Sequence, residues 1–132
     1  MNDIRHIAIV DDHTLFRKGL AALVNLFPGY RVLFDASDGT DCIRQLETGL
    51  QPDIILMDIT MPGMDGYEFV KLLRARPPER GGKVVALALT AFAGLADAAR
   101  AHASGYQGHL SKPITPDALA EAILDVKRRQ GR

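Results

Sequence analysis

One stretch in the middle of the chain, residues 53–66, limits what the whole sequence can fold into. Four apolar residues, 54–57, run directly into Asp58, and a loop rich in proline and glycine follows. This pattern predicts a buried strand whose last residue is a carboxylate at the rim of a sheet. An isolated acid in that position costs free energy unless a cation meets it. The rest of the chain should therefore supply a partner for Asp58.

The size and charge of the chain exclude several classes of protein. With 132 residues, we expect a single domain, residues 1–132. Its 16 Lys and Arg residues balance 16 Asp and Glu residues, so neither nucleic acid nor a membrane surface is expected as the direct partner. Cys42 is the one cysteine, which excludes an intramolecular disulfide. Without an apolar run of the ~20 residues that span a bilayer, we expect a cytoplasmic protein.

Hydrophobic patterning predicts that strands and helices alternate five times. The predicted strands are short, apolar and bounded by turn residues, and they cover residues 6–10, 31–36, 54–58, 83–89 and 106–110. A helical pattern follows each strand, and the last helix is expected to have Thr115 as its cap and Pro116 at its first position. Strands too apolar to face water on either side indicate a parallel sheet with helices on both faces. The sequence therefore predicts a doubly wound α/β fold.

Polar residues follow the predicted strands at their carboxyl ends. They are Asp11, Asp12, Asp58, Thr90 and Lys112. In an open parallel sheet these ends meet at one edge, where such folds bind their ligands. We therefore expect these five side chains to form one site.

Three carboxylates at one edge repel each other by about 3 kcal/mol per pair, at ~5 Å and an effective dielectric of ~20. A divalent cation with oxygen ligands offsets that repulsion, and Mg²⁺ fits because it takes one or two carboxylates and bridges to phosphate. Zinc is disfavoured, since the sequence has no Cys or His cluster at ligand spacing. With the ammonium of Lys112 and the hydroxyl of Thr90, this set suits phosphoryl transfer. Asp58 would be the nucleophile and would form an aspartyl phosphate.

The full length of the chain resembles the receiver domain of two-component response regulators. The matching features, in chain order, are Asp11-Asp12 after the first strand, Asp58 after the third, the run Met61-Pro62-Gly63-Met64-Asp65-Gly66, Thr90-Ala91 after the fourth and Lys112-Pro113 after the fifth. Any one of these motifs is weak, but five in this order are specific. The resemblance implies a five-stranded, flavodoxin-like receiver fold with strand order 2-1-3-4-5.

The resemblance also implies a role for each acid. Asp58 would accept a phosphoryl group from the phosphohistidine of a sensor histidine kinase or phosphotransfer protein. Asp12, Asp58 and the backbone carbonyl of Thr60 would bind Mg²⁺, and Asp11 would hold a metal-bound water. Such a domain catalyses its own phosphorylation and dephosphorylation and is a signalling domain rather than an enzyme with an external product.

The remaining implied roles concern the switch. Thr90 and Lys112 would contact the phosphoryl oxygens, and Pro113 would follow a cis peptide bond. The face built from the fourth helix, the fifth strand and the last helix would then rearrange to bind a downstream protein or a second copy of the chain. Regulators whose first loop is similar to residues 11–20 carry a DNA-binding helix-turn-helix, so the chain is either a stand-alone receiver or part of a larger regulator.

Two positions depart from the family pattern. His109 stands three residues before Lys112, where receivers usually have a Tyr or Phe that moves with Thr90. If His109 takes over the switch, its coupling should depend on pH near 6 to 7. Phe92 stands where a polar residue is common, and together with Thr60 it would flank the path of a hydrolytic water. Phe92 is therefore expected to slow dephosphorylation.

Two other functions compete with the phosphoacceptor switch. A receiver-like interaction module would bind partners without phosphorylation, and His109 supports this reading while the intact acids oppose it. A flavodoxin-like enzyme or Mg²⁺-dependent phosphatase would use a similar sheet. The first loop lacks a small phosphate cradle, however, and Thr60 stands where a phosphatase needs a proton-donating acid.

Overall fold

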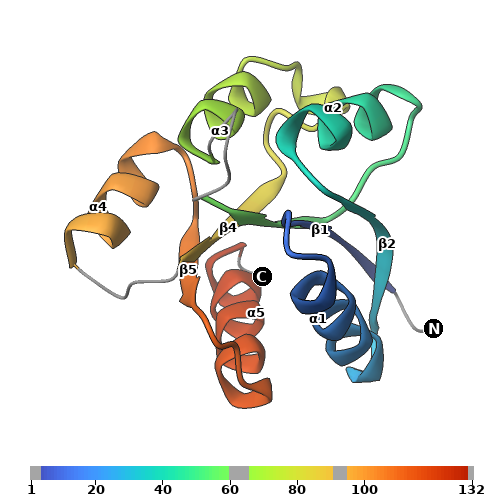
Figure 1. Cartoon of the computed structure of the whole chain (residues 1–132). Helices are drawn as coiled ribbons and strands as arrows, with labels where there is room; N and C mark the ends of the chain where they lie inside the picture. The colour runs from blue at the N-terminus through green and yellow to red at the C-terminus, as the bar shows by residue number, and fades with distance from the viewer. Residues whose placement is uncertain (1–3, 60–65, 91–94, 131–132) are drawn as a thin grey trace.

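The computed structural model describes residues 4–59, 66–90 and 95–130. Within these residues, five strands and five α-helices alternate along the chain (Figure 1). The strands are β1 (Arg5–Val10), β2 (Tyr30–Ala36), β3 (Ile54–Asp58), β4 (Val85–Thr90) and β5 (Gly108–Ser111). The helices are α1 (Thr14–Leu26), α2 (Gly39–Glu47), α3 (Gly66–Arg74), α4 (Leu95–Ser104) and α5 (Pro116–Gln130).

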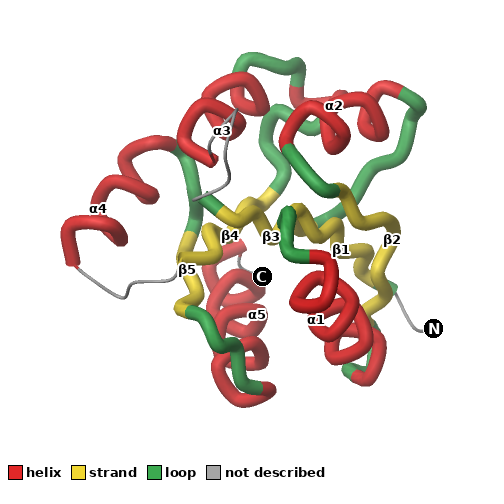
Figure 2. Tube along the Cα trace, viewed as in Figure 1, coloured by secondary structure: helices red, strands yellow, loops and turns green. Residues whose placement is uncertain are grey.

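The strands form one parallel sheet in the order β2-β1-β3-β4-β5, as predicted. The apolar strand β3 lies in the middle, between β1 and β4, and all five of its residues are buried (Figure 2). In register, Val10 pairs with Met57, and Asp58 pairs with Leu89. The carboxyl ends of β1, β3 and β4 therefore meet at one edge.

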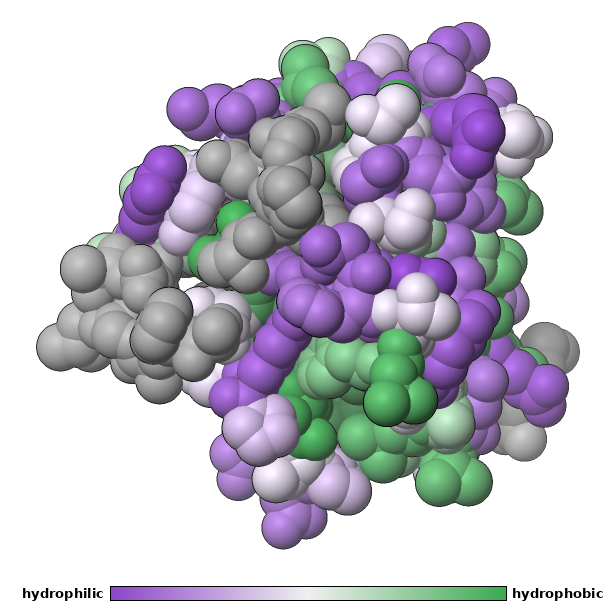
Figure 3. Space-filling model, viewed as in Figure 1, coloured by the Kyte–Doolittle hydropathy of each residue, from purple (hydrophilic) through white to green (hydrophobic). Residues whose placement is uncertain are grey.

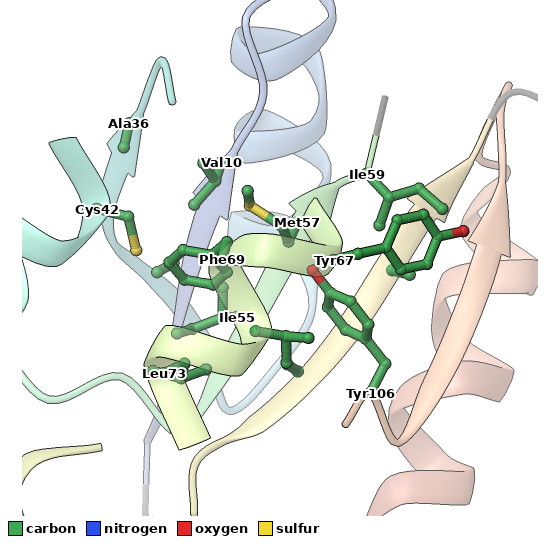
Figure 4. Packing of buried hydrophobic residues seen from close by; sticks show 14 of the residues in the cluster. Val10, Ala36, Cys42, Ile55, Met57, Ile59, Tyr67, Phe69, Leu73 and Tyr106 are labelled. Atoms are coloured by element: carbon green, nitrogen blue, oxygen red, sulfur yellow. The ribbon is translucent and has the colours of Figure 1, made fainter. Parts of the chain in front are cut away.

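Helices cover both faces of the sheet, with α1 and α5 on one face and α2, α3 and α4 on the other (Figure 1). Successive strand residues point to opposite faces. Ile55 and Met57 belong to the core under α2 and α3 (Figure 4). Ile54 and Leu56 belong to the core under α1 and α5. This double burial explains why the central strands β3 and β4 are apolar almost throughout. No helix in the described segments is long and apolar enough to cross a membrane.

The segment that leads into β5 differs from the sequence prediction. β5 begins at Gly108, not at residue 106, and the short 3-10 helix η1 (Pro78–Arg80) was not predicted. Tyr106 is instead buried in the core, and its hydroxyl donates to the carbonyl of Gly66 over 2.6 Å. Gln107 is held by the backbone N–H of Ala86, which donates to its Oε1 over 2.8 Å. These contacts fix the start of β5 against β4 and α3.

The helix boundaries follow the local signals. The hydroxyl of Thr115 accepts the backbone N–H of Ala118, so the predicted cap of α5 is confirmed. Asp38 caps α2 in the same way by accepting from Asp41. The described part of α4 begins at Leu95, and the helix ends at Ser104, directly before Gly105 with its positive φ.

A substitution at Gly66 tests how closely α3 approaches the end of β3. A Cβ added at Gly66 would lie 2.5 Å from the Cα of Ile59, whereas one added at Gly19, within α1, would meet nothing within 4 Å. Gly66→Ala should therefore lower the free energy of unfolding by about 1–3 kcal/mol. Gly19→Ala should raise it by about 0.5–1 kcal/mol, since alanine is the better helix former. Urea denaturation measures both, and a Gly66→Ala variant as stable as the wild type would contradict this packing.

Candidate functional site

The predicted site residues lie together at the carboxyl edge of the sheet. Asp11 follows β1, Asp58 ends β3 and Thr90 ends β4, and these side chains are 0%, 1% and 3% exposed. Lys112 follows β5. Seen from this side, hydrophilic residues gather at the centre of the face, over the loop between β1 and α1 (Figure 3). The structure thus brings residues from four strands to one point.

Lys112 is the cation that the buried acids require. Its Nζ lies 2.8 Å from Oδ2 of Asp11 and 3.4 Å from Oδ2 of Asp58. The same nitrogen lies 4.4 Å from the centre of the Phe16 ring. Burial acts to lower the pKa of Lys112, but the hydrogen bond to Asp11 and the charges of Asp58 and Asp11 together raise it above its ordinary value. The ammonium is therefore charged at neutral pH and compensates part of the carboxylate charge.

Backbone contacts hold Lys112 in this position. Its N–H donates to the carbonyl of Thr90 over 2.8 Å, and the next peptide bond, Lys112–Pro113, is cis. Ser111 pairs with Thr90 in the register between β4 and β5. Thr90 and Lys112 are therefore joined directly at this corner of the sheet.

The first loop adds two further potential metal ligands. Ligand atoms of Asp11, Asp12, His13 and Asp58 all lie within 4.8 Å of one another. Asp12 is more exposed than Asp11, with 35% of its side chain accessible against 0%. Three carboxylates in one cluster, one of them reachable from solvent, suit a hard divalent cation with water ligands. The residues present therefore fit Mg²⁺.

Arg17 lies outside the set of residues predicted from sequence, yet it supports this loop. Its Nη1 donates to the backbone carbonyl of Asp11 over 2.5 Å, and its Nε lies 3.4 Å from Oδ2 of Asp35. Burial acts to raise the pKa of Asp35, but the hydrogen bond and charge of Lys18 and the charge of Arg17 lower it below its ordinary value. Helical spacing to Leu20 and Val24, on the buried face of α1, is the signal that could have identified Arg17.

The other predicted residues have different placements. His109 lies exposed on β5, opposite Ala88 in the register with β4. Thr60 and Phe92 lie outside the described residues, so the predicted carbonyl ligand and the predicted water barrier have no structural description.

A hollow of about 580 Å³ lies at the opposite edge of the sheet, near the amino ends of the strands. Its lining carries charges of both signs. Arg76, for example, approaches Glu47 at 3.9 Å and donates to the carbonyl of Arg80 over 2.8 Å. None of the predicted site residues lines this hollow.

Removing the ammonium group tests the charge balance of the site. Without divalent ions, Lys112→Met should lower the free energy of unfolding by about 3–5 kcal/mol, because two buried carboxylates lose their cation. Added Mg²⁺ should reduce that loss. Since folding raises the pKa of Lys112, its contribution is complete below about pH 10 and disappears as the pH rises through the folded-state pKa.

Lys18→Met is the matched control for Lys112→Met, because Lys18 pairs with Asp35 at 3.0 Å while 61% of its side chain is exposed. That substitution should cost at most about 1 kcal/mol. Equal losses in the two variants, measured by urea denaturation, would contradict the assigned role of Lys112.

Comparison with known proteins places this geometry in a family. Residues 7–124 match the family model of the response regulator receiver domain. The transcriptional regulatory protein DegU of Brevibacillus brevis is 35% identical over 89% of this chain and 48% of its own length. The nitrate/nitrite response regulator protein NarL of Escherichia coli K12 is 33% identical over 89% of this chain and 52% of its own length. The chain spans about half the length of these curated relatives.

Solved structures agree with this placement. The signal receiver domain of the putative response regulator NarL from Mycobacterium tuberculosis has a TM-score of 0.82 at 29% identity, covering 98% of this chain and 99% of that one. The receiver domain of sensor histidine kinase PA1611 from Pseudomonas aeruginosa, with a magnesium ion coordinated in its active site cleft, has a TM-score of 0.78 at 30% identity. That match covers 92% of this chain and 96% of the other. The chain belongs to the response regulator receiver domain family of two-component systems.

Proposed function

We propose that this receiver domain is a phosphoacceptor switch, in which Asp58 takes a phosphoryl group from the phosphohistidine of a sensor histidine kinase or phosphotransfer protein. The contact of Lys112 with both Asp58 and Asp11 carries the proposal. A buried carboxylate beside a second buried carboxylate and a charged amine can act as a nucleophile while the same amine stabilises the added phosphoryl charge.

Each residue has a distinct part in the transfer. An Oδ of Asp58 forms a bond to phosphorus as the bond between phosphorus and the donor nitrogen breaks. The ammonium of Lys112, 3.4 Å from Asp58, stabilises the negative charge on the phosphoryl oxygens. Thr90, at the end of the neighbouring strand, would supply a hydroxyl donor to one of those oxygens. Hydrolysis of the aspartyl phosphate by water would return the domain to its first state.

Asp12 and Asp58, with the backbone carbonyl of Thr60, would hold Mg²⁺, and Asp11 would hold one of its waters. The ion would supply positive charge at the phosphoryl oxygens when bound. Asp11 already has its Oδ2 engaged by Lys112 and its Oδ1 engaged by the backbone N–H of His13. These two contacts favour an indirect role for Asp11 over direct nucleophilic attack.

Intact mass measurement tests the proposed acceptor. Incubation with acetyl phosphate and Mg²⁺ should add one phosphoryl group to the wild type and none to Asp58→Asn. Asp53→Asn is the matched control, because Asp53 precedes the same strand and lies exposed at its other end. It should be phosphorylated as the wild type is. No addition to the wild type would favour an interaction module that works without phosphorylation.

We further propose that phosphorylation changes the face formed by α4, β5 and α5. Thr90 is joined to Lys112 by a backbone hydrogen bond and to Ser111 by sheet pairing, so a shift of Thr90 acts directly on β5. His109 stands exposed on that strand, two residues from Ser111. A downstream protein or a second copy of the chain would bind to this face, and His109 would contribute to its switching.

Beryllium fluoride, a phosphoryl mimic, tests the coupling between Asp58 and this face. With Mg²⁺ it should shift the amide NMR signals of β5 and of the described parts of α4 and α5 in the wild type, but not in Asp58→Asn. Earlier elution from a size-exclusion column would identify a second copy of the chain as the partner of this face. Unchanged elution would indicate that a different protein is the partner. Amide signals that do not move in the wild type would refute the coupling.

A further inference from the structure

The group of potential metal ligands at this edge of the sheet contains a ring nitrogen, which a magnesium site does not require. His13 precedes α1 in an extended conformation, with φ −85° and ψ 98°, and makes no side-chain cap to the helix. Its Nδ1 instead lies 3.3 Å from Oδ1 of Asp11 and 3.3 Å from Oδ1 of Asp12. The ring of His13 therefore faces both acids of the pair.

These separations match those of ligands around a single ion. Ligand atoms ~2.1 Å from a metal stand ~3.0 Å apart at neighbouring octahedral positions and ~3.4 Å apart in a tetrahedron. The distance from Nδ1 of His13 to Oδ1 of Asp12, the first-loop acid expected to bind the ion directly, lies between these values. All four ligand atoms of the cluster lie within 4.8 Å of one another, which is near the ~4.2 Å that separates opposite ligands of an octahedral ion. The imidazole is 70% exposed, which leaves it accessible to an ion from solvent.

We propose that His13 is a nitrogen ligand in this site and raises the affinity of the site for divalent first-row transition ions relative to Mg²⁺. Imidazole suits such ions, whereas Mg²⁺ prefers oxygen ligands and retains its waters. The proposal rests on the metal site of the proposed function. It adds that His13 determines which ion occupies that site.

A competing explanation is that His13 acts only as a positively charged neighbour of Asp11 and Asp12. The two explanations predict opposite effects of removing the ring. Loss of a ligand weakens binding of transition ions and leaves Mg²⁺ unchanged. Loss of a positive charge strengthens the binding of every divalent cation, because the carboxylates then face it without an opposing charge.

Calorimetric titration with Zn²⁺ and with Mg²⁺, each alone, separates these explanations. His13→Ala should weaken Zn²⁺ binding by about tenfold or more, at least as much as the loss of an outer-shell partner, and should leave the Mg²⁺ dissociation constant unchanged. His102→Ala, at an exposed position on α4, is the matched control and should change neither constant. Asp58→Asn should weaken both ions, which locates them in this cluster.

A second readout uses the wild type and does not depend on the folding of a variant. The sequence contains 4 histidines, so their ring-nitrogen NMR signals can be assigned individually. Zn²⁺ should shift the Nδ1 signal of His13 by direct coordination, and Mg²⁺ should not. Equal Zn²⁺ affinity in wild type and His13→Ala, or tighter binding of both ions by the variant, would overturn the proposal while leaving the phosphoacceptor function intact. Failure of both ions to bind the wild type would reject the metal site itself.

Discussion

Two buried carboxylates share one ammonium group at the carboxyl edge of the sheet, and the rest of the site depends on this imbalance of charge. Asp11 and Asp58 are almost fully buried, and Lys112 contacts both. One positive charge cannot compensate two negative ones, so the site favours a further cation. Arg17 meets the backbone of Asp11 rather than its carboxylate, so it supports the loop without closing the site to an ion.

The fold could be predicted because the central strands β3 and β4 are apolar on both faces. Residues 54–57 alternate between the two cores, so all four are apolar. A strand with one face in water would instead alternate apolar and polar residues. The start of β5 could not be predicted in this way. Tyrosine is common in strands, which favoured a strand at Tyr106. Its hydroxyl instead donates a hydrogen bond to the carbonyl of Gly66, 40 residues earlier in the chain. A tertiary contact of that range leaves no local signal in the sequence.

The position of the site could be predicted because parallel strands bring their carboxyl ends together. Any polar residue at the end of an apolar run is then expected at this edge, as is the case for Asp11, Asp58, Thr90 and Lys112. The parts that could not be predicted depend on side-chain direction. Helical spacing places Arg17 on the buried face of α1, but it does not show that the guanidinium reaches the backbone of Asp11, and the ring of His13 could have pointed to solvent. Zinc was disfavoured from sequence because the chain has no Cys or His cluster at ligand spacing, and the closeness of the His13 ring to oxygens of Asp11 and Asp12 has no signal in that spacing.

The central claim is that the carboxylate at the end of β3 carries the signal. Borohydride reduces an aspartyl phosphate to homoserine and leaves free carboxylates unchanged, so it marks the acceptor chemically. After phosphorylation with acetyl phosphate and Mg²⁺, reduction and peptide mass spectrometry should locate homoserine at position 58 alone. Homoserine at position 11 or 12, or at no position in a chain that had gained a phosphoryl group, would contradict this account.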